Sequence, residues 1–164
     1  MPIGDDSDGP PTIGYREYVH LPDWGIRNVK AKADTGARSS AIDVAEIEEL
    51  PRDRVRFKVM LSRKNRERSV TIEAPIVRRA VVKSSLGHRD ERYTVETTLR
   101  IGGVERVVEI GLVCRQNMIC RMLLGRQALS GEFLVDPRRT YLYGKRAKSK
   151  KKRTVRKRRK NKSV

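Results

Sequence analysis

The sequence is poor in the residues that cross-link small domains or build metal sites. It has two cysteines and two histidines in 164 residues, and only 5% of its residues are aromatic. Two cysteines are too few for the disulfide framework of a small secreted domain. No stretch approaches the roughly 18 consecutive apolar residues of a membrane-spanning helix, and residues 1–12 are acidic, without the apolar segment of a secretory signal. We therefore expect a cytoplasmic protein with reduced thiols and no membrane partner.

Charge of one sign dominates, and it is unevenly distributed. The chain has 38 Lys and Arg against 20 Asp and Glu, a formal net charge of +18, and thirteen of those cations lie in residues 145–164, which contain no acid. Like charges repel, and such a segment cannot form a core. We predict a disordered acidic leader (1–12), a folded domain (13–144) and a disordered basic tail (145–164). The tail is dense enough in charge to bind nucleic acid or another polyanion, although it lacks the aromatic residues that stack on bases.

Apolar residues alternate with polar ones through most of the folded part, which is typical of β-strands. Gly102-Gly103 separates two long β-branched runs and indicates a hairpin. Two other hairpins are predicted over residues 15–33 and 55–73, and a fourth over 132–143 with its turn at Asp136-Pro137. Short helices are predicted at 44–50 and 126–130. The class is therefore mainly β, a closed or nearly closed barrel.

The sharpest local feature is Asp34-Thr35-Gly36, which follows the alternating stretch 29–33. A carboxylate at the end of a strand is held by a rigid scaffold, and a glycine lets the chain turn and keeps the backbone close to a ligand. The same three residues are also common in ordinary turns. From the tripeptide alone, a catalytic carboxylate and a simple turn both stay open.

A second element lies far along the chain: Leu123-Leu124-Gly125 followed by a short helical stretch. The pair resembles the retropepsin-type aspartic proteases. With Phe133-Leu134-Val135-Asp136-Pro137 as a third motif, the chain is similar to a bacterial and archaeal retropepsin-like family that carries the name ATP-dependent zinc protease. The resemblance covers residues 13–144 and implies a retropepsin-like closed β-barrel with one or two short helices.

The resemblance also implies a mechanism. Aspartic proteases need two carboxylates, and this chain has no second Asp-Thr-Gly or Asp-Ser-Gly, so the resemblance implies a homodimeric aspartic peptidase. By carry-over, Asp34 is the catalytic acid and base, Thr35 links the two loops and Gly36 holds the backbone near substrate. Ala37 and Arg38 are assigned to substrate binding. Members often occur beside glutamate-adding ligases of the RimK type, and a basic cleft would favour an acidic or glutamate-rich polypeptide substrate.

The zinc and ATP in the family's name find little support in the residues. There is no His-Glu-x-x-His motif, and the glycine spacing around Gly102 is wrong for a phosphate-binding loop. A metal site built from His88, Cys114 and Cys120 is conceivable, but the two cysteines are more typical of small apolar groups in a strand. We predict no metal and no cofactor.

The sequence alone leaves several interpretations of the flap, the dimer contact and the function open. The flap that closes over substrate is predicted in the hairpin 55–73, whose turn (62–68) is strongly basic, or in the segment 83–92. A dimer contact is predicted in the hairpin 133–143. The alternative to an enzyme is a catalytically silent, protease-like binding module tethered to RNA or ribosome by the tail. A third reading is a nucleic-acid-binding barrel in which Asp34 is a turn residue.

Overall fold

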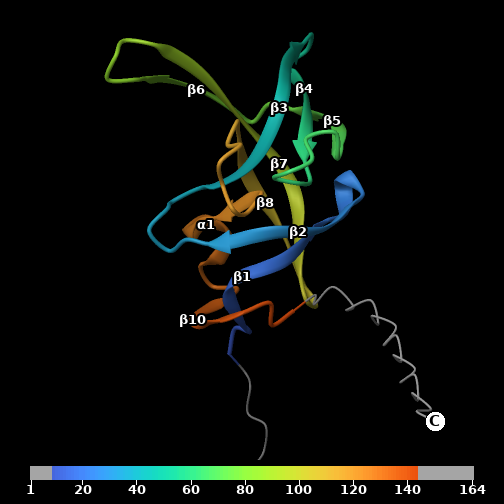
Figure 1. The fold of residues 1–164 in the computed structure, drawn as a ribbon, viewed down its shortest axis with the longest axis vertical. Coiled ribbons are helices and arrows are strands. Elements are labelled where there is room, and N and C mark those ends of the chain that lie inside the picture. Colours follow the sequence, from blue (N-terminus) through green and yellow to red (C-terminus); the bar gives the residue numbers. More distant parts are fainter. Residues whose placement is uncertain (1–8, 144–164) are drawn as a thin grey trace, which may run out of the picture.

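The computed structural model describes residues 9–143, and strands dominate this part of the chain. The elements are β1 (Thr12–Leu21), the 3-10 turn η1 (Pro22–Trp24), β2 (Ile26–Ala33), β3 (Ser40–Leu50), β4 (Arg54–Met60), β5 (Ser69–Pro75), β6 (Arg78–Lys83), β7 (Arg89–Ile101), β8 (Val104–Val113), β9 (Met122–Leu124), α1 (Arg126–Leu129) and β10 (Leu134–Thr140). Figure 1 shows how they wrap around one another.

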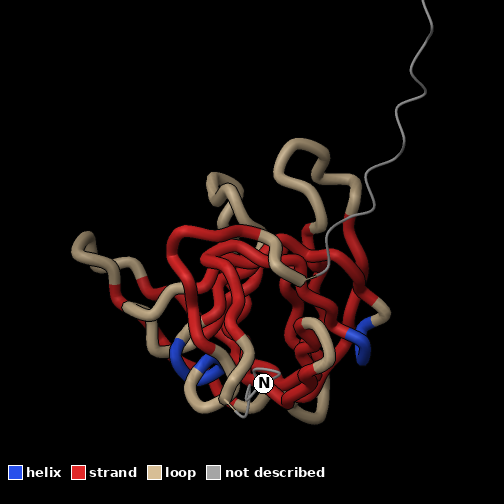
Figure 2. The backbone as a smooth tube through the Cα atoms, turned by 90° about the horizontal axis from the view of Figure 1, so that it is seen from below, coloured by secondary structure: helices blue, strands red, loops and turns tan. Residues whose placement is uncertain are grey.

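Six strands close into a β-barrel, which confirms the predicted mainly β class and the retropepsin-like barrel. Their order is β1-β2-β9-β3-β8-β7, and β7 returns to β1 through the pair His20 and Arg100. Figure 2 shows the strands forming a ring. The remaining strands extend from this ring: β10 lies beside β1, β6 beside β7, and the β4–β5 hairpin beside β3. The described strands thus leave three sheet edges, at β10, at β6 and at β5.

The core follows from the alternation seen in the sequence. Along β7 the side chains of Tyr93, Val95, Thr97 and Leu99 are buried while their neighbours face outward, which is the period of two expected of a half-buried strand. Large side chains with almost no exposure belong to one hydrophobic core: Ile13, Leu21, Ile42, Phe57, Ile110, Met122 and Leu124. The core therefore reaches from β1 to β9, the strand next to the candidate site.

Three of the four predicted hairpins are confirmed. The β1–β2 hairpin turns through η1 and Gly25, the β4–β5 hairpin through residues 61–68, and the β7–β8 hairpin through Gly102-Gly103. Gly25 and Gly102 both adopt a positive φ, of 65° and 58°, a conformation that other residues reach at a steric cost. The short helix predicted at 126–130 is also confirmed as α1.

The helix predicted at 44–50 is wrong, because these residues belong to β3. The strand pairs with β8 and β9 along its first half and with β4 along its second. Its register shifts between Ala45 and Glu48, and Glu46 has a φ of 51°. A bulge adds a residue and breaks the alternation. The three-residue spacing of Val44 and Ile47 does not mark a buried helix face, because Val44 is buried whereas Ile47 is exposed.

The fourth hairpin is also wrong. Residues 134–140 form the single strand β10, which runs parallel to β1 with Thr12 opposite Leu134 and Ile13 opposite Val135. Pro137 is compatible with this strand because β10 lies at the edge of the sheet, where an amide hydrogen is not needed on the outer side. The dimer contact predicted for residues 133–143 therefore concerns an edge strand, and it stays a prediction.

The predicted basic tail (145–164) and most of the predicted leader (1–12) lie outside the described residues. Within residues 9–143, no helix is long and apolar enough to cross a membrane.

Candidate active site

Asp34 lies directly after β2, and the end of that strand is fixed by β9. The two strands run parallel, with Ala31 opposite Met122 and Ala33 opposite Leu124. The pairing continues one step beyond β2, because the backbone N–H of Asp34 donates to the carbonyl of Leu124 at 2.9 Å. The carboxylate therefore leaves the barrel at a defined point on a rigid strand.

The loop that follows is closed by its own hydrogen bonds. One carboxylate oxygen of Asp34, Oδ1, accepts the N–H of Gly36 at 2.9 Å, and the N–H of Ala37 donates to the Asp34 carbonyl at 3.2 Å. This side-chain turn orients the carboxylate. Within the described residues the second carboxylate oxygen has no hydrogen-bond partner. Asp34 is half-buried, whereas Thr35 and Gly36 are exposed, so the group is fixed on one side and open on the other.

The start of α1 ties this loop down from the other side. The backbone N–H of Arg126 donates to the Ala37 carbonyl at 2.8 Å, and that of Gln127 to the Arg38 carbonyl at 3.0 Å. The Arg126 guanidinium reaches further, to the carbonyls of Thr35 at 3.1 Å and Gly36 at 3.0 Å. A cation on two carbonyls is a strong, directional contact. The loop thus has anchors at nearly every residue.

Gly125 allows the two segments to approach this closely. A Cβ atom at this position would lie 2.5 Å from the carbonyl oxygen of Ser39 and 2.9 Å from the carbonyl carbon of Arg38. Both are backbone atoms that cannot move aside cheaply. The N–H of Gly125 donates to the hydroxyl of Ser40, a buried residue at the start of β3. Leu124 and Gly125, two residues of the second motif, therefore lie directly against the segment that carries Asp34.

The residues assigned to substrate binding lie on the same loop. Ala37 is half-buried and uses its backbone groups within the loop, while the Arg38 side chain is exposed. All five predicted site residues, 34–38, are thus brought together. The sequence reasoning did not assign a role to Arg126 or to Ser40. Arg126 directly follows the Leu123-Leu124-Gly125 motif in the sequence, and that position was the available signal.

The residues considered for a metal are not gathered. Within residues 9–143, no three His, Cys, Asp or Glu side chains lie close enough to share a metal ion. Cys114 is exposed and Cys120 is buried, and burial raises the pKa of the Cys120 thiol. A raised pKa disfavours the thiolate that binds metal or acts as a nucleophile.

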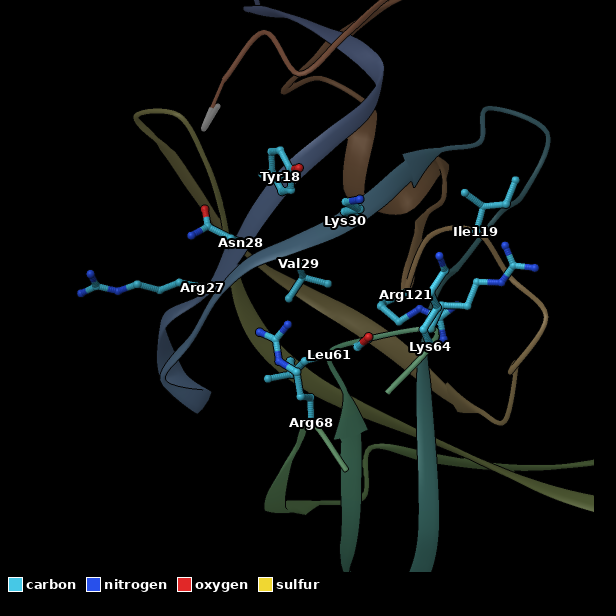
Figure 3. Close-up of a pocket in the computed structure, with 12 residues that line it drawn as sticks. Tyr18, Arg27, Asn28, Val29, Lys30, Leu61, Lys64, Arg68, Ile119 and Arg121 are labelled. Carbon is cyan, nitrogen blue, oxygen red and sulfur yellow. The ribbon is translucent and has the colours of Figure 1, made fainter. Parts of the chain in front are cut away.

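A basic hollow lies against the outer face of the β1–β2 hairpin, the same hairpin that ends in Asp34. Figure 3 shows it, with Tyr18 and Lys30 projecting from the two strands and Arg121 and Lys64 across from them. Its other wall is the loop 61–68, one of the two segments predicted as a flap.

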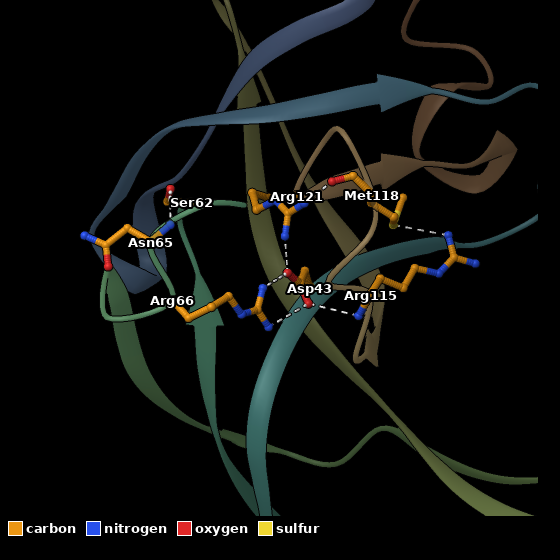
Figure 4. Close-up of polar contacts among 7 residues, drawn as sticks. All are labelled: Asp43, Ser62, Asn65, Arg66, Arg115, Met118 and Arg121. Atoms are coloured by element: carbon orange, nitrogen blue, oxygen red, sulfur yellow. Dashed lines mark hydrogen bonds and ion pairs between the residues drawn. The ribbon is translucent and has the colours of Figure 1, made fainter.

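That loop is held to the barrel by a buried acid that the sequence reasoning missed. Asp43, on β3, is fully buried and accepts the N–H of Arg115 at 3.0 Å. Its carboxylate also pairs with the guanidinium groups of Arg121 and of Arg66, the latter at 2.5 Å and from the loop itself. Figure 4 shows the cations converging on it. The loop is therefore anchored to β3 of the barrel through Arg66.

The second flap candidate behaves differently. Every residue of β6 is exposed, and Figure 1 shows the β6–β7 hairpin projecting well beyond the barrel. Its tip is closed locally, because the N–H of Ser84 donates to the His88 carbonyl at 2.8 Å and the N–H of Gly87 to the Ser84 carbonyl at 2.9 Å. Gly87 has a φ of 82°. The hydrogen bonds at its tip thus come from the hairpin itself.

The strand-end Asp-Thr-Gly loop, braced by an apolar-apolar-Gly strand and a helix, now has a match among known families. A family model described as RimB-like, the retropepsin-like aspartic endopeptidase RimB, matches residues 12–146. The chain belongs to this family. The resemblance drawn from the sequence motifs is confirmed.

Relatives of this RimB-like chain have other names. A probable alpha-L-glutamate ligase of Shewanella pealeana is 34% identical over 143 residues, 85% of this chain and 31% of the relative. One of Desulfotalea psychrophila is 33% identical over 128 residues, 76% of this chain and 28% of the relative. This chain thus spans less than a third of the length of the curated relatives it matches.

A crystal structure has the same fold. The Legionella pneumophila protein Lpg0085, described as having unknown function, matches with a TM-score of 0.66 and 25% sequence identity. The match covers 80% of this chain and 97% of that one. The fold of this RimB-like chain therefore accounts for almost the whole of the Legionella structure.

Proposed function

We propose that the protein is an aspartic endopeptidase that acts as a homodimer, with Asp34 from each copy at the centre. The observation that carries this is the Asp34 loop: one carboxylate on a braced strand end, with one oxygen held by Gly36 and the loop exposed beyond it. A single carboxylate cannot be acid and base at once, and the chain has one such loop. Two copies supply the pair.

The chemistry follows from bringing two carboxylates together. Like charges a few ångström apart cannot both ionise cheaply, so the pair shares one proton and titrates as a unit. The ionised Asp34 takes a proton from water as the water attacks the peptide carbonyl, while the protonated Asp34 of the other copy donates a hydrogen bond to that carbonyl. The C–N bond then breaks, and the leaving nitrogen takes up the proton that was removed from water. Thr35 is at the exposed turn of the loop, suited to contact its symmetry mate. The Gly36 N–H fixes the carboxylate plane.

The substrate we propose is an acidic, glutamate-rich polypeptide. Two features support it: the strongly basic chain, and relatives that carry the name probable alpha-L-glutamate ligase and are about three times longer. An enzyme that cleaves such chains would act on material of the kind that a glutamate ligase makes. The β6–β7 hairpin is the proposed flap, since the loop 61–68 is anchored at Asp43.

The test is a peptidase assay on Asp34→Asn beside a matched control. Asn has almost the shape of Asp, so the loop bond to Gly36 is kept while the acid is lost. Asp53→Asn serves as control, because Asp53 is a surface carboxylate paired with Arg79. We expect Asp34→Asn to lose turnover of a glutamate-rich peptide and to keep its solution mass as a dimer. Asp53→Asn should retain turnover.

Two results would contradict the proposal. Full turnover by Asp34→Asn would remove the carboxylate from the chemistry. A wild-type chain that is monomeric at every concentration at which it cleaves peptide would exclude the shared pair. A dimer that binds acidic peptide without any turnover would favour the silent binding module instead.

A further inference from the structure

The basic hollow beside β2 has walls of one charge. It has a volume of about 480 Å³. Six cationic side chains line it and no Asp or Glu does: Arg27, Lys30, Arg63, Lys64, Arg68 and Arg121. Two strands, one loop and the segment before β9 contribute to this lining. The positive charge is therefore gathered from several elements and does not come from the exposed face of a single one. Such a cleft focuses a positive potential and attracts anions.

A second, smaller hollow of about 290 Å³ continues it. Ile119 lines both. Here the cations are Arg16, Lys32 and Arg115, again without an acid. The strand register explains the continuity, because Tyr18 lies opposite Lys30 and Arg16 opposite Lys32 on the paired strands β1 and β2. We call the two hollows together the basic groove.

The cations of the basic groove are poorly compensated. Within the described residues only Arg121 among them forms an ion pair, with Asp43. Arg121 is 3% exposed, and its buried Nε has no hydrogen-bond partner in the described part of the chain. The same holds for the buried Nε of Arg16. Donors that are covered but unpaired are costly, and mutually repelling cations favour a bound anion that supplies acceptors.

The second hollow reaches residues next to the catalytic loop, although none of residues 34–38 lines either hollow. Lys30, Lys32 and Asp34 are spaced two residues apart. The two lysines on β2 therefore lie in line with the acid that follows the strand. Lys32 lies opposite Leu123, which lines the second hollow, and the next residue, Leu124, holds the backbone of Asp34. The groove therefore runs along the strand that carries the catalytic carboxylate.

We propose that the basic groove binds an acidic polypeptide in extended form and sets the specificity of the enzyme for the segment beside the cleaved bond. The cleavage part of this statement rests on the proposed peptidase function, whereas the binding part does not. Successive outward residues of a strand are about 6.6 Å apart. An extended peptide with alternate acidic side chains has the same spacing and can pair with Lys30 and Lys32 in turn.

The lining also favours polypeptide over nucleic acid. Val29, Leu61, Ile119 and Leu123 give the basic groove apolar patches that suit the methylene stems of glutamate. Its one aromatic residue, Tyr18, already stacks on Tyr141 with ring centroids 4.6 Å apart. One face of this ring is therefore occupied, and the described lining has no further aromatic residue for the base stacking on which binding of single-stranded nucleic acids relies.

The test measures binding apart from turnover. In the Asp34→Asn background, affinity for a labelled oligo-glutamate peptide is measured by fluorescence anisotropy with and without Lys30→Gln/Lys64→Gln. Both lysines are exposed. We expect the double change to weaken binding about tenfold, the sum of two modest ion pairs, and to reduce its salt dependence. Lys58→Gln/Arg56→Gln is the matched control, with the same loss of charge on β4, outside the groove.

The basic tail is present in every variant, so its contribution cancels in the comparison. Equal affinity in the groove variant and the control would overturn the proposal. So would an oligonucleotide of equal charge that binds the Asp34→Asn chain more tightly and is weakened by the groove variant, because nucleic acid would then occupy the groove.

A second arm uses the active chain. Lys30→Glu should raise the KM for a glutamate-rich peptide and lower it for a lysine-rich one, with little change in kcat, and unchanged KM values for both would overturn the proposal. The two failures are distinguishable. Turnover that survives Asp34→Asn defeats the peptidase assignment and leaves the binding result standing. Turnover that is lost in Asp34→Asn but has an unchanged KM in Lys30→Glu would contradict only the proposed role of the basic groove.

Discussion

The backbone N–H of Asp34 donates to the carbonyl of Leu124 at 2.9 Å, which joins the loop after β2 to a strand near the other end of the folded chain. This bond continues the parallel β2–β9 pairing by one residue. The acid is therefore positioned by long-range sheet structure and not by its turn alone. Substitutions of the contacting residues test how much of the site geometry depends on long-range contacts of this kind.

Gly125→Ala should be strongly destabilising, because the new Cβ would lie 2.5 Å from the Ser39 carbonyl oxygen. Overpacking of this kind costs about 1–3 kcal/mol, measured here by urea denaturation. Gly103→Ala is the control: a Cβ there meets nothing within 4 Å, and the change should stay within about 0.5 kcal/mol. Equal effects of the two changes would mean that close packing at Gly125 is not what holds the loop.

Arg126 should act as a positioning residue. Its guanidinium bonds to the carbonyls of Thr35 and Gly36, so Arg126→Met should misplace the loop while the barrel remains folded. A misplacement of about 1 Å can lower turnover about 100-fold, and the loss should fall on kcat. Arg126→Lys can still reach one carbonyl and should restore part of it. A change in KM alone would indicate that Arg126 binds substrate instead.

Removal of the buried acid should cost more than removal of a surface one. Asp43→Ala leaves Arg121 buried without its counter-charge, which costs about 3–5 kcal/mol. The double variant Asp43→Leu/Arg121→Met removes both charges and should recover much of that loss. Glu48→Ala breaks the exposed pair with Arg56 and should cost less than about 1 kcal/mol. Denaturation midpoints decide the order, and a double variant as unstable as Asp43→Ala would contradict this reasoning.

His20 should make stability fall in mild acid. Burial, then the charges of Arg100 and Arg27, hold the pKa of His20 below its ordinary value of 6.5. The unfolded chain then binds more protons, so the contribution is complete above pH 6.5 and is lost as pH falls below it. In His20→Gln the amide oxygen can still accept the Asn28 N–H that His20 Nδ1 accepts at 3.2 Å. This variant should lose less stability than wild type between neutral and mildly acidic pH, and an identical loss would contradict the prediction.

Local patterns predicted the parts of the fold that depend on local rules. Alternation and turn glycines were enough for the β1–β2, β4–β5 and β7–β8 hairpins, since each pairs neighbouring segments. The register shift in β3 interrupts the alternation of apolar and polar residues, so residues 44–50 lacked the pattern that indicates a strand. β10 was missed for a different reason: its partner, β1, lies at the opposite end of the chain, and nothing in residues 134–140 specifies that pairing.

The candidate site divides in the same way. Asp34, Thr35 and Gly36 could be identified because a strand leads directly into them, and Leu123, Leu124 and Gly125 because they match a family motif. The basic groove could not, because its cations come from β1, β2, the loop 61–68 and the segment before β9. In a chain with this many Lys and Arg, only the folded arrangement shows which of them share a wall.

The contacts between the Asp34 loop and residues 124–127 can form only late in synthesis of the folded part. During synthesis, residues 34–36 leave the ribosome long before β9 and α1 exist. Contacts between segments so distant in sequence form late. Until those segments are made, the acid lacks its main-chain anchors and the carbonyls of Thr35 and Gly36 lack their cation. The Asp34 loop therefore reaches its braced form only after residues 122–127 have been made.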